Sequence, residues 1–325
     1  MKYVDMHCDT ADELYTQNVG LYENNLHIDI KKMQKGECLL QNFAVFTNIA
    51  KNDSSFTKNV IDNYYRQLDL NKDYIAPIYK YDDIKVNEDK NLISAMLTLE
   101  EGSVIDDNLD NLDFYYSKGV RMITLTWNYV NGIGYPNVLK DGRDRDDILY
   151  DVNTKDGLTD FGIEYVKKCN ELGIIVDVSH LSDAGFYDVL KYSSKPFVAS
   201  HSNARTVCPV GRNLTDDMIK KLADKGGVMG LNYCADFMHD KVNNGVCKID
   251  YIVEHALHIV NVGGIDCLGL GSDFDGIDND IEFKNAAGVP LIYEALSKHF
   301  NEEELSKIFY KNVLRVYKEC MKWKI

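Results

Sequence analysis

Short apolar runs alternate with amphipathic segments along the whole chain. Eight runs have the length and composition of buried strands, and they lie at Tyr3–Met6, Leu39–Phe46, Leu92–Leu99, Val120–Thr126, Ile174–Val178, Phe197–Ala199, Val228–Asn232 and Cys267–Gly271. Apolar residues at helical spacing predict helices at Thr57–Leu70, Leu158–Leu172, Asp183–Tyr192, Asp216–Lys225, Tyr251–Val262, Leu291–His299 and Glu302–Lys322. Alternation of this kind indicates parallel strands joined by crossover connections.

Eight strands, each followed by a crossover, predict an α/β fold of the closed (β/α)₈ or TIM-like barrel type. The pattern alone also allows an open doubly wound sheet. We find no Pro- or Ser-rich linker, so residues 1–325 are expected to form a single barrel domain. The longest gap between a strand and a helix, 127–155, is rich in Asn, Asp and Gly, and its length is typical of a functional lid or insertion.

Composition narrows the partners and the compartment. The chain has 325 residues, 45% of them hydrophobic, so it can bury a substantial core. Its formal net charge of −15 argues against a nucleic-acid partner, which clustered Lys and Arg would have to hold. The sequence contains no apolar stretch long enough to span a bilayer, no signal-peptide pattern and no C-x-x-C among its eight cysteines. We therefore expect a cytoplasmic protein with no membrane partner.

Polar side chains follow the strand-like runs at equivalent positions. The candidates are His7, Asp9, Glu100, His180, His201 and Asp273. Residues two apart on a strand share a face, so His7 and Asp9 emerge together, and only one of Glu100 and Glu101 can face the barrel centre. In a parallel barrel the C-terminal strand ends meet at one face, where active sites lie.

Imidazole and carboxylate side chains together suit a divalent metal. Three histidines and two carboxylates exceed the needs of one tetrahedral zinc, and they suit two ions that share a carboxylate, with Asp273 left to move protons. Each residue also has a structural interpretation. The histidines could be hydrogen-bonded core residues, Asp9 and Glu100 could cap helices, and Asp273 and Asp275 could shape a turn.

The motifs around these residues resemble the membrane dipeptidase (renal dipeptidase) family of dinuclear zinc peptidases, in its bacterial-type form. The resemblance runs from His7 to the final helix and rests on His7-Cys8-Asp9, Glu100-Glu101-Gly102, Leu125-Thr126-Trp127, Asp177-Val178-Ser179-His180, His201-Ser202-Asn203-Ala204-Arg205, Gly211-Arg212-Asn213-Leu214 and Gly271-Ser272-Asp273-Phe274-Asp275-Gly276. It implies a (β/α)₈ barrel of the metal-dependent hydrolase type and, by analogy with the animal enzymes, allows a homodimer.

The resemblance also implies roles for the candidate residues. One zinc ion would be held by His7, Asp9 and Glu100, and the other by Glu100, His180 and His201, with Glu100 bridging the two. A metal-bridging hydroxide would attack the carbonyl of a small dipeptide, and Asp273 would carry the proton to the leaving amine. The same ligand types would also accept manganese or cobalt.

The resemblance assigns substrate contacts as well. Arg212 matches the family arginine that receives the substrate's C-terminal carboxylate, a role that guanidinium geometry suits, and Arg205 is its rival. Animal members carry a histidine after the fourth strand that polarises the scissile carbonyl, whereas this chain has Trp127 there. Indole donates one hydrogen bond and cannot become cationic, so Asn128 is a candidate for the missing donor.

Three functions follow. The leading hypothesis is a zinc-dependent dipeptidase. The alternative is a dinuclear hydrolase acting on another amide, a lactone or a phosphoester, because one fold hosts many chemistries. Trp127 motivates a third hypothesis, a catalytically silent metal-binding protein, while the acidic balance argues against a nucleic-acid hydrolase.

Overall fold

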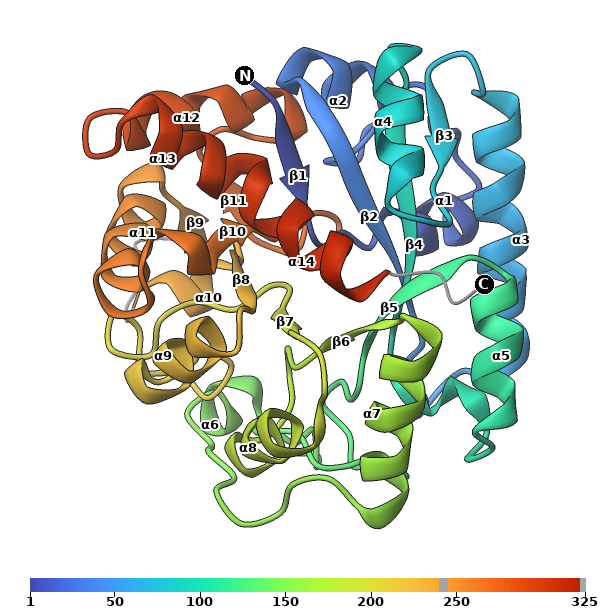
Figure 1. Cartoon of the computed structure of the whole chain (residues 1–325), viewed down its shortest axis with the longest axis vertical. Helices are drawn as coiled ribbons and strands as arrows, with labels where there is room; N and C mark the ends of the chain where they lie inside the picture. The colour runs from blue at the N-terminus through green and yellow to red at the C-terminus, as the bar shows by residue number, and fades with distance from the viewer. Residues whose placement is uncertain (240–244, 322–325) are drawn as a thin grey trace.

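The computed structural model describes residues 1–239 and 245–321 (Figure 1). Its central feature is a closed barrel of eight parallel strands, which are β1 (Tyr3–Asp5), β2 (Cys38–Phe46), β4 (Ile93–Glu100), β5 (Val120–Thr124), β6 (Ile175–Asp177), β7 (Val198–Ala199), β8 (Val228–Leu231) and β10 (Leu268–Leu270). Neighbours along the chain pair in turn, and β1 pairs with both β2 and β10, which closes the ring. All eight predicted strands are found, so the predicted barrel is confirmed and the open sheet is excluded.

The described residues contain three further short strands that the sequence pattern did not predict. Strand β3 (Ile75–Pro77) pairs with the first half of β4, and β5 takes its place from Leu97 onward. Strands β9 (Val246–Cys247) and β11 (Asp280–Ile281) form a separate two-stranded sheet.

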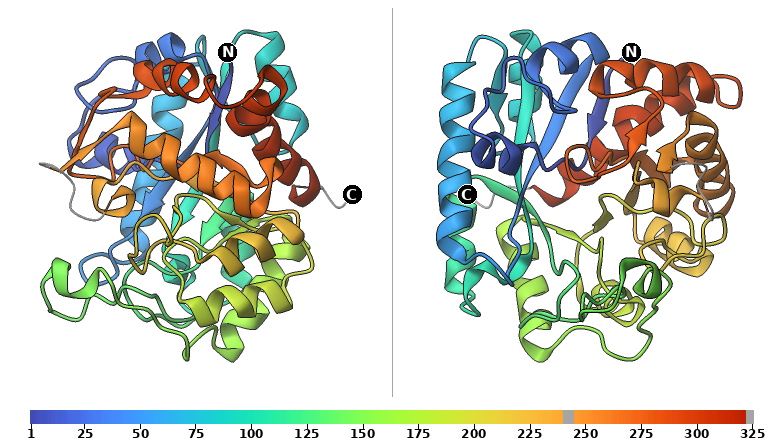
Figure 2. Two further views of the ribbon diagram at one scale, coloured as in Figure 1. Left: turned by 90° about the vertical axis from the view of Figure 1, so that its left-hand side faces the viewer. Right: turned by 180° about the vertical axis from the view of Figure 1, so that it is seen from behind.

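Helices surround the barrel in most of the crossovers (Figures 1 and 2). They are α1 (Thr10–Thr16), α2 (Ile30–Gly36), α3 (Ser54–Leu70), α4 (Asp82–Asp89), α5 (Asp110–Ser117), α6 (Arg145–Ile148), α7 (Asp160–Leu172), α8 (Asp183–Tyr192), α9 (Asp216–Asp224), α10 (Ala235–Met238), α11 (Ile249–Gly263), α12 (Val289–Leu296), α13 (Glu302–Ser306) and α14 (Asn312–Cys320). Side chains of Thr159, Ser182 and Thr215 cap α7, α8 and α9 at their N-termini. The predicted helix 302–322 is divided by a π-helical turn at Lys307–Lys311, and its residue 322 lies outside the described residues.

Helix α14 closes the N-terminal end of the barrel. Its Val313, Val316 and Tyr317 pack against side chains from the barrel interior, which include Val4, Leu40, Met96, Met122, Ile175, Val198 and Val228. The amide of Asn42 donates a hydrogen bond of 2.6 Å to the Tyr317 hydroxyl inside this end. Figure 1 shows α14 crossing in front of the strands. Helix α14 thus covers this end of the barrel with apolar side chains.

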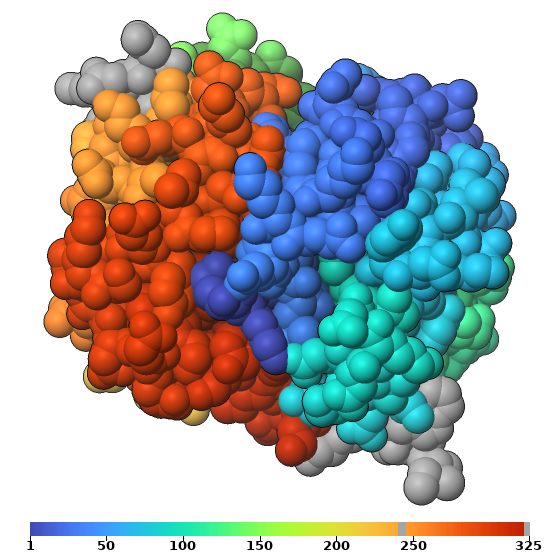
Figure 3. All heavy atoms as spheres, turned by 90° about the horizontal axis from the view of Figure 1, so that it is seen from above, coloured from blue at the N-terminus to red at the C-terminus, as the bar shows by residue number. Residues whose placement is uncertain are grey.

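The first and last parts of the chain lie side by side, as Figure 3 shows from above, where the N-terminal strand meets the C-terminal helices. This contact follows from barrel closure, since β1 pairs with β10. Within residues 1–239 and 245–321, no helix combines the length and the apolar character that crossing a membrane requires.

Candidate active site

The six candidate residues all lie at the C-terminal ends of barrel strands. His7 and Asp9 follow β1, Glu100 is the last residue of β4, His180 follows β6, His201 follows β7, and Asp273 follows β10. Five of them are at most 8% exposed, and the Asp273 side chain is 13% exposed. His180 and Asp273 have positive φ angles of 70° and 63°, a conformation that favours glycine.

Three ligand-type atoms converge on one side of the cluster. The Nε2 atoms of His180 and His201 lie 3.1 Å apart, and Glu100 Oε1 lies 2.9 Å from the first and 3.6 Å from the second. Burial together with Arg212 lowers the pKa of His180, and burial together with His7 lowers that of His201 well below its usual value. Both rings are therefore neutral at neutral pH, which is the form that binds metal.

The tautomers of these two rings are set by their outer nitrogens. His180 Nδ1 lies 2.8 Å from Asn128 Oδ1, which can only accept, so Nδ1 carries the proton. His201 Nδ1 lies 2.7 Å from the Ser200 hydroxyl, which in turn donates to Asp177 Oδ2 at 2.5 Å. Both Nε2 atoms consequently present lone pairs, next to a carboxylate oxygen. Three acceptors facing one another fit a shared cation between them.

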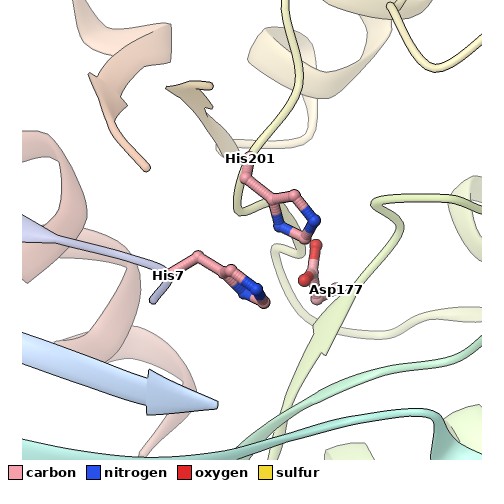
Figure 4. A group of neighbouring side chains, drawn as sticks. All are labelled: His7, Asp177 and His201. Carbon is pink, nitrogen blue, oxygen red and sulfur yellow. The ribbon is translucent and has the colours of Figure 1, made fainter. Parts of the chain in front are cut away.

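Asp177 was not among the predicted residues, although it begins the Asp-Val-Ser-His motif. It groups with His7 and His201, and Figure 4 shows these side chains pointing toward one another from β6, β1 and the end of β7. Its Oδ1 accepts from the main-chain nitrogens of Ser179 and Ser200, and its Oδ2 accepts from two hydroxyls. With both oxygens engaged, Asp177 supports His201 through Ser200.

The second group of atoms surrounds the other oxygen of Glu100. His7 Nε2 lies 3.3 Å from Glu100 Oε2 and 3.6 Å from Asp9 Oδ2. Neither ring nitrogen of His7 nor Asp9 Oδ1 has a hydrogen-bond partner among the described residues, although all three atoms are buried. Buried polar atoms of native proteins are almost always satisfied, so these atoms fit a further cation. Asp9 precedes α1, but its side chain makes no capping hydrogen bond. The alternative interpretation of Asp9 as a helix cap is therefore excluded.

The charge of Glu100 affects the pKa values of ionisable side chains in both groups of ligand atoms. Burial alone would raise the pKa of Glu100, but the His7, His180 and His201 rings hold it well below its usual range. Burial would lower the pKa of His7, yet the Glu100 and Asp9 carboxylates outweigh it and raise that pKa well above its usual value. Burial and the neighbouring Glu100 charge raise the pKa of Asp9 to about 8. A dense cluster of carboxylates is stabilised by cations.

The adjacent Glu101 points away from this cluster, as strand alternation predicts. Its carboxylate accepts hydrogen bonds from the main-chain nitrogens of Ser103 and Trp127, both at 3.1 Å, and from the Asn131 side chain. Glu101 therefore fastens the start of the segment that follows β5.

Asp273 lines the cavity, and a hydrogen bond holds one of its two carboxylate oxygens. Its Oδ2 accepts a 2.9 Å hydrogen bond from the amide of Asn232, and its Oδ1 lies 3.8 Å from His7 Nε2. Asp275 differs, because its carboxylate accepts hydrogen bonds from the Thr10 hydroxyl and from the main-chain nitrogens of His27 and Ile28. Of the two predicted turn residues, Asp275 shapes the loop and Asp273 has an oxygen close to the cluster.

A cavity of about 490 Å³ opens over the cluster. Arg212 lines it and is 4% exposed, with weak hydrogen bonds of 3.4 Å to the Ser202 hydroxyl and 3.2 Å to the main-chain oxygen of His201. Its Nε has no partner among the described residues, and burial lowers its pKa. Arg205, the rival, instead makes a two-pronged ion pair with Asp183, with both contacts at 2.7 Å.

Trp127 and Asn128 also line the cavity. The Trp127 ring packs against Phe46, with ring centroids 4.8 Å apart, and Lys140 Nζ lies 5.3 Å from its centroid. The predicted lid segment contributes Val138, Lys140, Arg143, Arg145, Ile148 and Leu149 to the cavity wall. Sequence reasoning missed these wall residues because nothing in their local pattern marks which of them face the barrel.

A closed barrel of eight parallel strands with a buried His, Glu and Asp cluster at its C-terminal face defines a TIM barrel with a candidate metal site. The chain belongs to the membrane dipeptidase (peptidase family M19) family, whose sequence profile matches residues 1–324. It is thus a metallo-dipeptidase family hydrolase, and its cluster is a candidate metal site.

Individual relatives agree. An uncharacterized dipeptidase of Schizosaccharomyces pombe is 31% identical over 321 residues, which cover 92% of this chain and 74% of the relative. The crystal structure of dipeptidase AC, an M19 metallopeptidase, is similar with a TM-score of 0.89 and 23% identity, covering 99% of both chains. A metallopeptidase from Rhodobacter sphaeroides, crystallised with a phosphinate mimic of the dipeptide L-Ala-D-Ala, has a TM-score of 0.87 at 22% identity, covering 98% of this chain and 99% of its own. At these identities, the two crystal structures support the fold.

Proposed function

We propose that this protein hydrolyses small dipeptides with the help of two divalent metal ions, zinc being the expected metal. The observation that carries the proposal is the orientation of Glu100, whose Oε1 faces His180 and His201 while its Oε2 faces His7. A carboxylate directed at two separate groups of ligand atoms has the arrangement that a bridging ligand needs. His7, Asp9 and Glu100 would hold one ion, and Glu100, His180 and His201 would hold the other.

When bound, two divalent ions supply a nucleophilic hydroxide at neutral pH and stabilise the negative charge that develops on the substrate. The chain's own residues supply the rest. The Ser200–Asp177 pair and Asn128 hold the His201 and His180 rings with their lone pairs inward. Burial of the cluster excludes bulk water, which strengthens every charge interaction inside it.

In the proposed reaction Asp273 moves the proton. A hydrogen bond from Asn232 holds one of its carboxylate oxygens, and the other oxygen lies 3.8 Å from His7 Nε2, which supports this role. In this proposal, Asp273 accepts a proton as the peptide carbonyl is attacked and delivers it to the departing amine.

Arg212 binds the substrate's free carboxylate. A buried guanidinium with two weak hydrogen bonds and an unpartnered Nε retains donors for a planar anion in the cavity. Trp127 and Asn128 also line the cavity, and the indole N–H and the Asn128 amide nitrogen are the candidate donors to the scissile carbonyl, because the contact with His180 uses only the Asn128 oxygen. The dipeptide mimic bound to the R. sphaeroides protein supports this substrate class.

The decisive test is dipeptide hydrolysis, followed by chromatography, with protein that has been stripped by chelator and then reloaded with zinc. Cleavage that disappears on stripping and returns with zinc supports the proposal. If zinc-loaded protein cleaves esters, lactones or neutral amides but no dipeptide, the alternative hydrolase chemistry replaces it. Two tightly bound ions without hydrolysis of any of these would favour a silent metal-binding protein. Gel filtration would test the expected homodimer separately.

A further inference from the structure

We propose that Asn137, Asp183 and Arg205 form a clasp that positions Arg212 and the cavity wall, and so sets the affinity for substrate without touching it. The proposal rests on the proposed function in one respect, which is that Arg212 receives the substrate's carboxylate. The three clasp residues come from separate parts of the chain. Asn137 lies in the segment between β5 and α7, Asp183 begins α8, and Arg205 lies in the loop after β7.

Arg205 holds the backbone on both sides of Arg212. Its Nε donates to the main-chain oxygen of Asn213 at 2.8 Å, and its Nη2 donates to that of Gly211 at 3.1 Å. The two outer nitrogens meanwhile pair with the two oxygens of Asp183. One planar guanidinium therefore fixes the carbonyls before and after Arg212 relative to α8, a geometry that a lysine cannot reproduce.

Asn137 connects the cavity wall to Asp183 and to the Gly211 carbonyl, both of which Arg205 also contacts. Its amide nitrogen donates to Asp183 Oδ1 at 2.7 Å and to the Gly211 oxygen at 2.8 Å. Its Oδ1 accepts from the main-chain nitrogens of Asp183 at 3.0 Å and Asn153 at 2.9 Å. Its own main-chain nitrogen donates to the His180 oxygen at 3.2 Å. Asn137 and Asp183 are 5% and 6% exposed, so water competes little for these bonds.

The wall segment also packs directly on the residue before Arg212. The main-chain nitrogen of Gly211 donates to the Leu149 oxygen at 2.9 Å, and a Cβ added to Gly211 would lie 1.9 Å from the Asp151 oxygen. The Arg212 side chain itself makes two long hydrogen bonds and lies over the Phe237 ring, 5.3 Å from its centroid, so its position also depends on this backbone. The segment is a fixed wall rather than a free lid, and loosening the clasp moves Arg212 together with the wall.

The consequence for the reaction is specific. The clasp side chains bond to one another and to main-chain atoms, not to the ligand atoms of the metal cluster or to Asp273, so the proposal expects their loss to leave the chemical step intact. A misplaced Arg212 binds the carboxylate less well in the ground state and in the transition state alike, which raises KM with little change in kcat.

The first experiment compares Arg205→Lys with Arg315→Lys. Arg315 is the matched control, because its guanidinium also clamps two main-chain oxygens, those of Gly226 and Asp266, but at the opposite end of the barrel. Arg205→Lys should raise KM for a dipeptide by about tenfold with kcat and zinc content within twofold of the parent. Arg315→Lys should lower the unfolding temperature, because it loses these hydrogen bonds, and it should leave KM unchanged. An unchanged KM in Arg205→Lys, or an equal rise in Arg315→Lys, would overturn the proposal.

A second readout does not depend on activity. Trypsin can cleave after Lys140, Arg143 and Arg145 in the wall segment, and mass spectrometry can follow each site in the zinc-loaded protein. Asn137→Ala and Arg205→Lys should both accelerate cleavage at these sites about tenfold or more relative to Arg315→Lys. Cleavage as slow as in the parent would refute the clasp. If the parent cleaves no dipeptide, the proposed function fails, but the proteolysis result still decides whether the clasp exists. If Arg205→Lys does not fold, Asn137→Ala replaces it in both experiments.

Discussion

Replacing Arg212 with Met tests the substrate-binding side of the account most sharply. Methionine keeps an unbranched apolar stem that ends about where Arg Nε lies, and it removes every donor. Arg212 is buried, so the substrate carboxylate it receives is also removed from water, and truncating one partner of such a pair costs roughly 2–5 kcal/mol. Taking about 3 kcal/mol, kcat/KM for a dipeptide should fall about 150-fold. The carboxylate is bound in the ground state and in the transition state, so most of the loss should appear in KM.

The assay pairs a dipeptide such as Ala-Ala with its C-terminal amide, which lacks the carboxylate, using zinc-loaded protein. In the parent, kcat/KM should be higher for the dipeptide than for its amide. Arg212→Met should reduce the ratio of these two kcat/KM values by about the same 150-fold. Arg143→Met is the matched control, because Arg143 also lines the cavity but is already paired with Asp141 and Asp151. An equal fall for both substrates in Arg212→Met, or an equal effect of Arg143→Met, would refute the assignment of Arg212.

Three further predictions concern proton transfer, metal binding and pH. Asp273→Asn keeps the shape of the side chain but cannot accept a proton, so kcat should fall about 10²–10⁴-fold while zinc content stays the same. Ser200→Ala breaks the link from His201 to Asp177, and zinc affinity measured by competition with a chelator should fall about 10–100-fold. His255 is buried and neutral, since burial lowers its pKa to about 4 from a usual 6.5, and its ring donates to the Met238 oxygen and accepts from the main-chain nitrogen of Ala204. As pH falls, the His255 ring is protonated in the unfolded chain before it is protonated in the folded protein. The free energy of unfolding, measured by urea titration, should therefore keep its full value above pH 6.5 and fall by about 3 kcal/mol as pH is lowered to 4.

Each of these has a control. A normal kcat in Asp273→Asn would remove that residue from the reaction. Ser193→Ala, which removes another buried serine hydroxyl that bonds Asn170, should leave zinc affinity unchanged, and an equal loss there would make the Ser200 effect nonspecific. His255→Gln should flatten the fall in stability between pH 6.5 and 4, and a fall as steep as in the parent would assign it to other groups.

The periodicity of the sequence predicted the barrel strands because each is a buried run with turn residues around it. It missed β3, whose apolar run contains Pro77, and β9 and β11, which lie between polar residues and belong to no apolar run. The predicted ranges also did not include α1, α2, α4, α5, α6 and α10, each of which has eight residues or fewer and no long apolar stripe. The predicted helix 302–322 contains a π-helical turn at Lys307–Lys311, which helical periodicity does not mark.

The candidate ligands could be found because a parallel barrel gathers its C-terminal strand ends, so one rule located side chains from five strands. The supporting residues could not be found in this way. Whether Arg205 or Arg212 faces the cavity depends on where Asp183 lies, and Asp183 is 22 residues away in sequence and on another element. Asn137 likewise acts through contacts with Gly211 and Asp183 that no local spacing marks.

The central claim is that two ions share Glu100 and that hydrolysis needs both. The most direct test adds zinc stepwise to chelator-stripped protein and follows bound zinc by mass spectrometry together with dipeptide hydrolysis. We predict binding that ends at two ions per chain, with full activity reached only as the second site fills. Hydrolysis that persists in the stripped protein, or that is complete with one ion per chain, would contradict the account.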